Sequence, residues 1–131
     1  MLNKTGYLTV RAYTAGGALP VEGAIVRIRG AEDGNRDVIY SLLTDRDGIT
    51  EKVSLPAPPR ELSESPSPTD VPFAIYDIEI VKDGYFTKRL NNIPVFEGIN
   101  SEQLIAMIPS SGGGENYPLG NINANEEIAP I

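Results

Sequence analysis

The chain contains no cysteine and no histidine among its 131 residues. Without cysteine, it has no disulfide framework, no thiolate nucleophile and no cysteine-ligated metal. Without histidine, it lacks the side chain that most often serves as a general base near neutral pH, as a metal ligand, and in Ser-His-Asp or Cys-His arrangements. We therefore expect that the chain is not an enzyme and that it holds no cofactor.

Basic side chains are also scarce, and the net charge is −7. Residues 110–131 carry no basic side chain at all, but they hold Glu115, Glu126 and Glu127. An acidic surface repels phosphate backbones, so we expect neither nucleic acid nor an anionic membrane as a partner. The opening residues lack the apolar run of a signal peptide, and no segment has transmembrane length. The sequence thus predicts no export signal and no membrane insertion, and it leaves the compartment open.

Alternating apolar residues predict an all-β domain with one core over residues 1–109. In the first strand, residues 7–13, Leu8, Val10 and Ala12 share one face. After Pro20 and Gly23, a second strand turns Ala24, Val26 and Ile28 inward and Arg27 and Arg29 outward. Further strands are expected at 38–43 (a central strand, since it is apolar on both faces), from 49 or 50 to 55, and at 73–81, 85–90 and 102–108. Short strands separated by turn signals predict a seven-stranded antiparallel Greek-key β-sandwich.

A proline-rich segment interrupts this pattern at residues 56–72, which hold six of the eleven prolines. Proline lacks the amide donor that a ladder needs, so we expect neither strand nor helix there. A stiff crossover loop is the favoured interpretation. The alternative is an extended docking segment in which Pro58, Pro59 and Pro66 contact a partner.

The C-terminal residues 110–131 are rich in Gly, Asn and Glu, and the sequence predicts a separate, disordered tail. Its isolated apolar residues are more numerous than a solubilising tail requires. The alternative is therefore a tail that orders on a partner or adds a strand to an open sheet edge, with Tyr117 and Ile122 as candidate contacts.

Three other groups of residues are candidate sites. Asp45, Asp47 and Glu51 offer oxygen ligands for calcium, but a structural Asp-Gly turn is the favoured interpretation. Asp77 and Glu79 are two residues apart on one strand, where a solvated face is favoured over acid/base chemistry. Tyr7 and Tyr13 lie on the outward face of the first strand, where packing against another sheet or subunit is favoured and stacking on a sugar or a peptide is the alternative.

Four phrases in order carry a family resemblance: Gly6, Leu8 and Val10; Pro20 to Ile28; Thr44, Asp45 and Gly48; and Tyr76 to Tyr85. Over residues 6–108 they resemble the carboxypeptidase regulatory-like (transthyretin-like, prealbumin-like) β-sandwich domains. The stretch from Leu55 to Ile78, together with residues 106–109, is similar to a non-catalytic region of clostridial spore cortex-lytic enzymes. The second resemblance implies a peptidoglycan or spore setting, without lytic activity.

Together these features predict a binding or structural module of a bacterial envelope, spore or extracellular assembly. We expect a protein partner or self-association, with peptidoglycan as another ligand and with an edge strand or the proline-rich segment as the contact. One alternative is an accessory domain that acts with a peptidase or cell-wall hydrolase. The second alternative, a transthyretin-like enzyme, ranks last because the chain lacks the histidines that the resemblance implies for such hydrolases.

Overall fold

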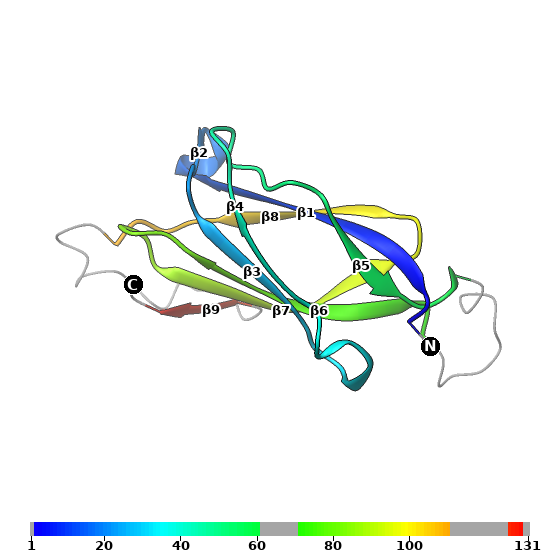
Figure 1. The fold of residues 1–131 in the computed structure, drawn as a ribbon. Coiled ribbons are helices and arrows are strands. Elements are labelled where there is room, and N and C mark those ends of the chain that lie inside the picture. The colour runs from blue at the N-terminus through cyan, green and yellow to red at the C-terminus, as the bar shows by residue number, and fades with distance from the viewer. Residues whose placement is uncertain (1, 61–70, 111–125, 130–131) are drawn as a thin grey trace.

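The computed structural model describes residues 2–60, 71–110 and 126–129 (Figure 1). These residues form two short 3-10 helices, η1 (Ala15–Gly17) and η2 (Asp33–Asn35). They also form nine strands: β1 (Lys4–Thr14), β2 (Leu19–Pro20), β3 (Ile25–Gly30), β4 (Ile39–Leu43), β5 (Val53–Ala57), β6 (Phe73–Val81), β7 (Thr87–Phe96), β8 (Asn100–Ala106) and β9 (Glu126–Ala129). In the described ranges, no helix has the length and apolar character to cross a membrane.

The strands form two sheets that pack face to face, as Figure 1 shows. In the first sheet β1 pairs with β2, β5 and β8; in the second the order is β4-β3-β6-β7-β9. The predicted all-β sandwich is confirmed, with two differences in detail. The described strands number nine, and β8 runs parallel to β1. The chain crosses from β7 in one sheet to β8 in the other, so no hairpin imposes an antiparallel direction on this pair.

The core lies between the two sheets and follows the alternation predicted from the sequence. The inward residues of β1, of β3 with the residue before it, and of β6 are almost fully buried: Leu8, Val10, Ala12, Ala24, Val26, Ile28, Tyr76, Ile78 and Ile80. Arg27 and Arg29 are exposed, as expected. Because side chains alternate between the two faces of a strand, this burial fixes which residues of the second sheet face solvent.

Three strand predictions are wrong. Residues 38–43 do not form a central strand, because β4 lies at the edge of its sheet and, among the described strands, pairs with β3 alone. The strand expected at 85–90 does not end there, because β7 continues through Asn91, Asn92 and Pro94 to Phe96 and a register shift opposite β6 absorbs the irregularity. Pro56 lies inside β5, which tolerates a missing amide donor because, of the strands that the structure describes, β1 alone pairs with it.

The end of the chain contributes a strand to the second sheet. Residues 126–129 form β9, which pairs antiparallel with β7 along Thr87 to Leu90. These four residues therefore follow the alternative prediction, in which the tail adds a strand to an open sheet edge. The prediction of a disordered tail is wrong for them. The remaining tail residues, 111–125 and 130–131, lie outside the described part of the chain.

Tyr76 joins the two layers from the centre of β6. Its hydroxyl donates a hydrogen bond of 2.6 Å to the Pro56 carbonyl of β5. Burial raises the pKa of Tyr76 to about 12, above the ordinary value of 10.0. The folded state thus favours the protonated phenol more strongly than the unfolded state does.

We expect this phenol to make the domain sensitive to alkali. Because the folded pKa is raised, its contribution is complete below the unfolded pKa of about 10 and is lost as the pH rises toward about 12, by roughly 2–3 kcal/mol in total. Chemical denaturation between neutral pH and about pH 11.5 measures this loss. Tyr76→Phe is the control: it is less stable at neutral pH because it lacks the hydroxyl, but its stability declines less steeply with alkali. Parallel pH profiles for the two proteins would contradict the assignment.

Candidate functional site

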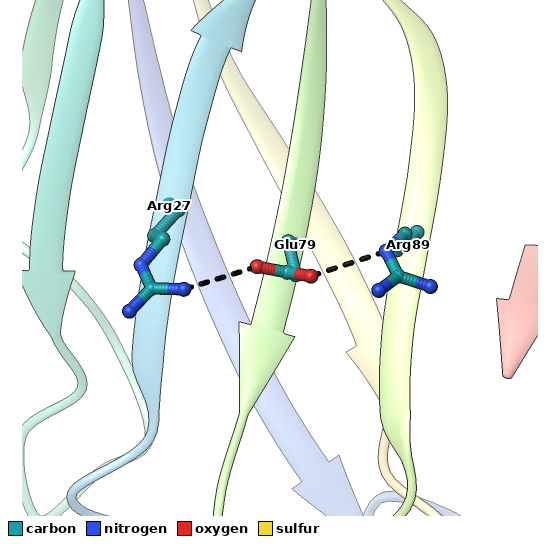
Figure 2. A network of polar contacts seen from close by, with 3 residues as sticks. All are labelled: Arg27, Glu79 and Arg89. Carbon is teal, nitrogen blue, oxygen red and sulfur yellow. Dashed lines mark hydrogen bonds and ion pairs between the residues drawn. The ribbon is translucent and has the colours of Figure 1, made fainter. Parts of the chain in front are cut away.

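The outward face of the second sheet carries a row of charged side chains. Arg27 on β3, Glu79 on β6 and Arg89 on β7 are direct cross-strand neighbours in the register. Glu79 accepts hydrogen bonds through both carboxylate oxygens, 3.2 Å from Nη1 of Arg27 and 3.1 Å from Nε of Arg89 (Figure 2). Strand alternation places these residues, which lie far apart in the sequence, in one line across three strands.

This network does little for stability, since all three side chains are partly exposed and such ion pairs contribute about 0–1 kcal/mol each. Its consequence is positional: it holds two guanidinium groups side by side. The row borders a shallow hollow of about 360 Å³, whose lining also includes Arg29 and Asp77. Within the described residues the Arg29 guanidinium has no hydrogen bond or ion pair. Three arginines thus lie on one face of a chain whose net charge is −7. Guanidinium groups bind carboxylate ligands well.

β4 forms the edge of the sheet beside this row, and no described strand pairs with its outer side. Gly30 N–H donates to the Val38 carbonyl, and Thr44 N–H donates to the Ala24 carbonyl, each at 3.0 Å. In an antiparallel ladder the residues between such pairs point their main-chain groups the other way. The N–H and C=O groups of Ile39, Ser41 and Leu43 are therefore directed toward the open side of the sheet.

The side chains of the same edge are unusually apolar for a surface. Ile39 is 59% exposed and Leu43 is 64% exposed. Both lie on the outward face, where Leu43 is paired with Ile25 and Ile39 with Arg29. The structure thus brings an apolar edge and an arginine row together on one face.

Sequence reasoning placed Arg27, Arg29 and Glu79 outward but did not bring them together with Arg89 or with β4. The apolar residues at 38–43 led to the wrong prediction of a central strand. They are apolar for two different reasons. Leu42 is buried and Tyr40 is half-buried against the core, whereas Ile39 and Leu43 are exposed. An edge strand with one unusually apolar outer face has the same pattern as a strand buried on both faces.

The tyrosines predicted for the first strand are half-buried. The ammonium of Lys52 lies 5.0 Å from the centre of the Tyr7 ring, a cation–π contact. Tyr13 lines a second hollow of about 370 Å³ with Arg11, Pro20 and Asp47 among its neighbours. The two rings therefore lie in different environments on the first sheet, whereas the arginine row lies on the second sheet.

The other candidate contacts fall in two groups. Pro58 is buried and Pro59 is half-buried, so the structure does not present Pro58 to a partner. Pro66, Tyr117 and Ile122 lie outside the described residues. They stay predictions.

The calcium candidates lie at the turn before β5. Asp45 uses Oδ1 to accept hydrogen bonds from the main-chain N–H groups of Asp47, at 2.8 Å, and Ile49, at 3.0 Å. Asp47 and Glu51 are exposed. Among the described residues, no group of three or more His, Cys, Asp or Glu side chains is placed to hold a metal. The Asp45 carboxylate thus has a structural task in this turn.

Comparison with known proteins identifies the fold and no family: neither a protein-family model nor a curated protein sequence matches the chain. Among solved structures, the chain is similar to the Bacillus anthracis TIE protein (TM-score 0.53, 15% identity), covering 81% of this chain and 17% of that one. It is also similar to catechol 1,2-dioxygenase from Acinetobacter, with a TM-score of 0.56 and 13% identity over 88% of this chain and 56% of that one. A third similar structure is hydroxyquinol 1,2-dioxygenase from Pseudomonas putida, with a TM-score of 0.54 and 11% identity over 81% of this chain and 57% of that one. At these identities the similarity shows a shared β-sandwich fold.

The expectation that the chain is not an enzyme is contradicted by this comparison. It depended on the missing histidine and cysteine, yet the same sandwich occurs within two dioxygenases. The fold therefore does not exclude catalysis. The chain spans less than two thirds of each of these proteins, so their activities belong to longer chains.

Proposed function

We propose that this chain is a protein-binding β-sandwich module that takes up an extended segment of a partner protein along the free edge of β4. The observation that carries the proposal is the unprotected state of this edge. Natural edge strands usually carry charges or prolines that prevent further pairing. Of the described strands that lie at sheet edges, β2 and β5 contain proline and β8 and β9 contain glutamate, whereas β4 (Ile-Tyr-Ser-Leu-Leu) contains neither.

Two further features support strand addition at β4. The outward main-chain groups of Ile39, Ser41 and Leu43 supply donors and acceptors in the spacing that an added strand needs. The exposed side chains of Ile39 and Leu43 supply apolar surface on which alternate residues of that strand pack. Main-chain hydrogen bonds then provide affinity, and side-chain contacts provide selectivity.

A partner protein fits this edge better than a second copy of the chain. If two β4 strands paired antiparallel about Ser41, Ile39 of one copy would lie opposite Leu43 of the other. The same register would place Asp37 of each copy opposite Asp45 of its neighbour. Like charges opposite each other are destabilising, and each copy also carries a net charge of −7. The proposal therefore commits to a heterologous strand.

We expect Ser41→Pro to abolish binding of an extended peptide at this edge. Proline removes the outward N–H of residue 41 but leaves the ladder positions that face β3, where Tyr40 pairs with Ile28 and Leu42 with Val26. Ser41→Ala, which keeps the N–H, is the matched control. The probe is a synthetic peptide of about nine residues with alternating apolar and polar side chains, long enough for one strand. Hydrogen exchange of the amides of Ile39, Ser41 and Leu43 reports its docking.

In the wild-type protein and in Ser41→Ala, the peptide should slow exchange of the three outward amides. In Ser41→Pro it should leave the two remaining amides unprotected, although the variant melts cooperatively. Equal peptide binding by Ser41→Pro and Ser41→Ala would rule out the β4 edge. Tighter self-association of the wild type than of Ser41→Pro in sedimentation would identify a second copy as the occupant instead.

The finer assignments depend on the resemblance and stay part of the proposal. They are membership of the carboxypeptidase regulatory-like domains, a place in a bacterial envelope, spore or extracellular assembly, and an accessory role beside a peptidase or cell-wall hydrolase. Co-sedimentation with purified peptidoglycan sacculi, compared between the wild type and Ser41→Pro, distinguishes a glycan ligand from a protein strand.

A further inference from the structure

We infer that the strand bound by β4 carries a carboxylate side chain directly opposite Ser41, with an apolar residue two positions to each side. This inference depends on the proposed function, because it names the chemistry of the partner at the same edge. The residues that matter are the three exposed ones on the outward face of β4. In order along the strand they are apolar, small and apolar: Ile39, Ser41 and Leu43.

The register places Ser41 at the end of the charged row. Arg27 of β3 is its direct partner, and Glu79 and Arg89 follow on β6 and β7. An added strand would put one of its outward residues at the next position of this row. Two strand spacings, about 9–10 Å, would separate that residue from the Arg27 main chain. A glutamate and an arginine side chain together span this separation, and the small Ser41 leaves the space between them open.

Arg27 is able to bind a second carboxylate. Its contact with Glu79 uses Nη1, and a guanidinium has five N–H donors in a planar fork. Figure 2 shows the other terminal nitrogen directed away from Glu79, on the side of β3 where β4 lies. A carboxylate at the new position would continue the alternation of charge across the sheet: carboxylate, Arg27, Glu79, Arg89.

The neighbouring positions reinforce this selection. Arg29 lies on the same face two residues along β3 and has no hydrogen bond or ion pair within the described part of the chain. A lysine in the bound strand would therefore approach two arginines, and like charges on adjacent strands are unfavourable. Residues opposite Ile39 and Leu43 would bury apolar surface against them, which favours apolar side chains there. The partner segment is thus an extended apolar–x–acidic–x–apolar strand.

The test uses three synthetic peptides of about nine residues that differ at one central position, which is glutamate, glutamine or lysine, with isoleucine and valine two positions away. Fluorescence anisotropy measures their binding to the wild type, Arg27→Gln, Arg27→Glu, Ser41→Pro and the control Arg11→Gln, whose arginine lies on the other sheet. We expect the glutamate peptide to bind the wild type about tenfold more tightly than the glutamine peptide, and the lysine peptide to bind most weakly. This preference should persist in Arg11→Gln, disappear in Arg27→Gln and reverse toward lysine in Arg27→Glu.

The outcomes separate the two proposals. If the three peptides bind equally and Ser41→Pro abolishes their binding, the edge is correct and the carboxylate selection is wrong. A glutamate preference that survives both Arg27 substitutions also overturns the selection. If Ser41→Pro binds as the wild type does, or if no peptide binds at millimolar concentration, strand addition at β4 fails and the selection fails with it.

Discussion

Val26→Asp should leave the domain largely unfolded under conditions in which the wild type is native. Val26 is fully buried in the centre of β3, where its side chain faces the opposite sheet. A carboxylate at this position would lie among apolar core side chains, and its direct cross-strand neighbours, Leu42 and Ile80, are both buried and apolar. Burial of an unpaired charge or its forced protonation costs several kcal/mol, and we expect a loss of at least about 4 kcal/mol. Domains of this size are stable by only about 5–15 kcal/mol in total.

The measurement is thermal and chemical denaturation followed by circular dichroism. The expected result is a melting temperature lower by roughly 15 °C or more, or no cooperative transition at all. Ile25→Asp is the matched control, because Ile25 precedes Val26 on the same strand but lies on the outward, partly exposed face. It should melt within a few degrees of the wild type. Equal stability of the two variants would contradict the assignment of faces in β3.

The sandwich was predictable wherever one face of a strand is buried and the other is solvated. In β3 and β6 each inward residue is apolar and each outward residue near the charged row is polar, so the period of two is unambiguous. β4 shows the limit of this reasoning. Its outward residues Ile39 and Leu43 are also apolar although they are exposed, so the pattern of an edge strand was interpreted as that of a central strand.

Breaks in a strand were less predictable than strands themselves. Asn91, Asn92 and Pro94 are typical of a turn, yet they lie within β7. Asn92 adopts a positive φ of 61°, and its N–H is bound by the Asp77 carboxylate at 3.0 Å. The bulge therefore depends on a residue from another strand, 15 positions away. Local propensity cannot include such a partner.

The candidate site was predictable only in its components. The outward direction of Arg27 and Glu79 follows from alternation, but their contact with each other and with Arg89 follows from the register of β3, β6 and β7. Register is set by long-range pairing, and a shift of one residue would reverse every side chain. A single sequence does not specify which strands are neighbours, so the arginine row and the adjacent edge appear only in the folded chain.

Gly30→Ala should destabilise the domain strongly although it adds a single methyl group. Gly30 ends β3, and a Cβ atom there would overlap the main-chain carbonyl and the side-chain Oδ1 of Asn35. Asn35 cannot move away cheaply, because it is only 2% exposed and is bonded on two sides. Its Nδ2 donates to the Ile75 carbonyl at 3.1 Å, and its Oδ1 accepts from the Glu32 N–H at 2.9 Å.

Relief of this overlap requires η2 to shift and these buried hydrogen bonds to lengthen or break, so we expect a loss of about 3 kcal/mol. Gly34→Ala is the control, since it adds the same methyl group to the same loop. Its Cβ would meet only the Leu2 side chain, 3.4 Å away, within ordinary contact distance, and its stability should change by less than about 1 kcal/mol. Denaturant titration of both variants measures the difference. Equal midpoints for Gly30→Ala and Gly34→Ala would show that Asn35 does not lock η2 against β3, whereas a large gap between them would establish this loop as a fixed part of the sandwich.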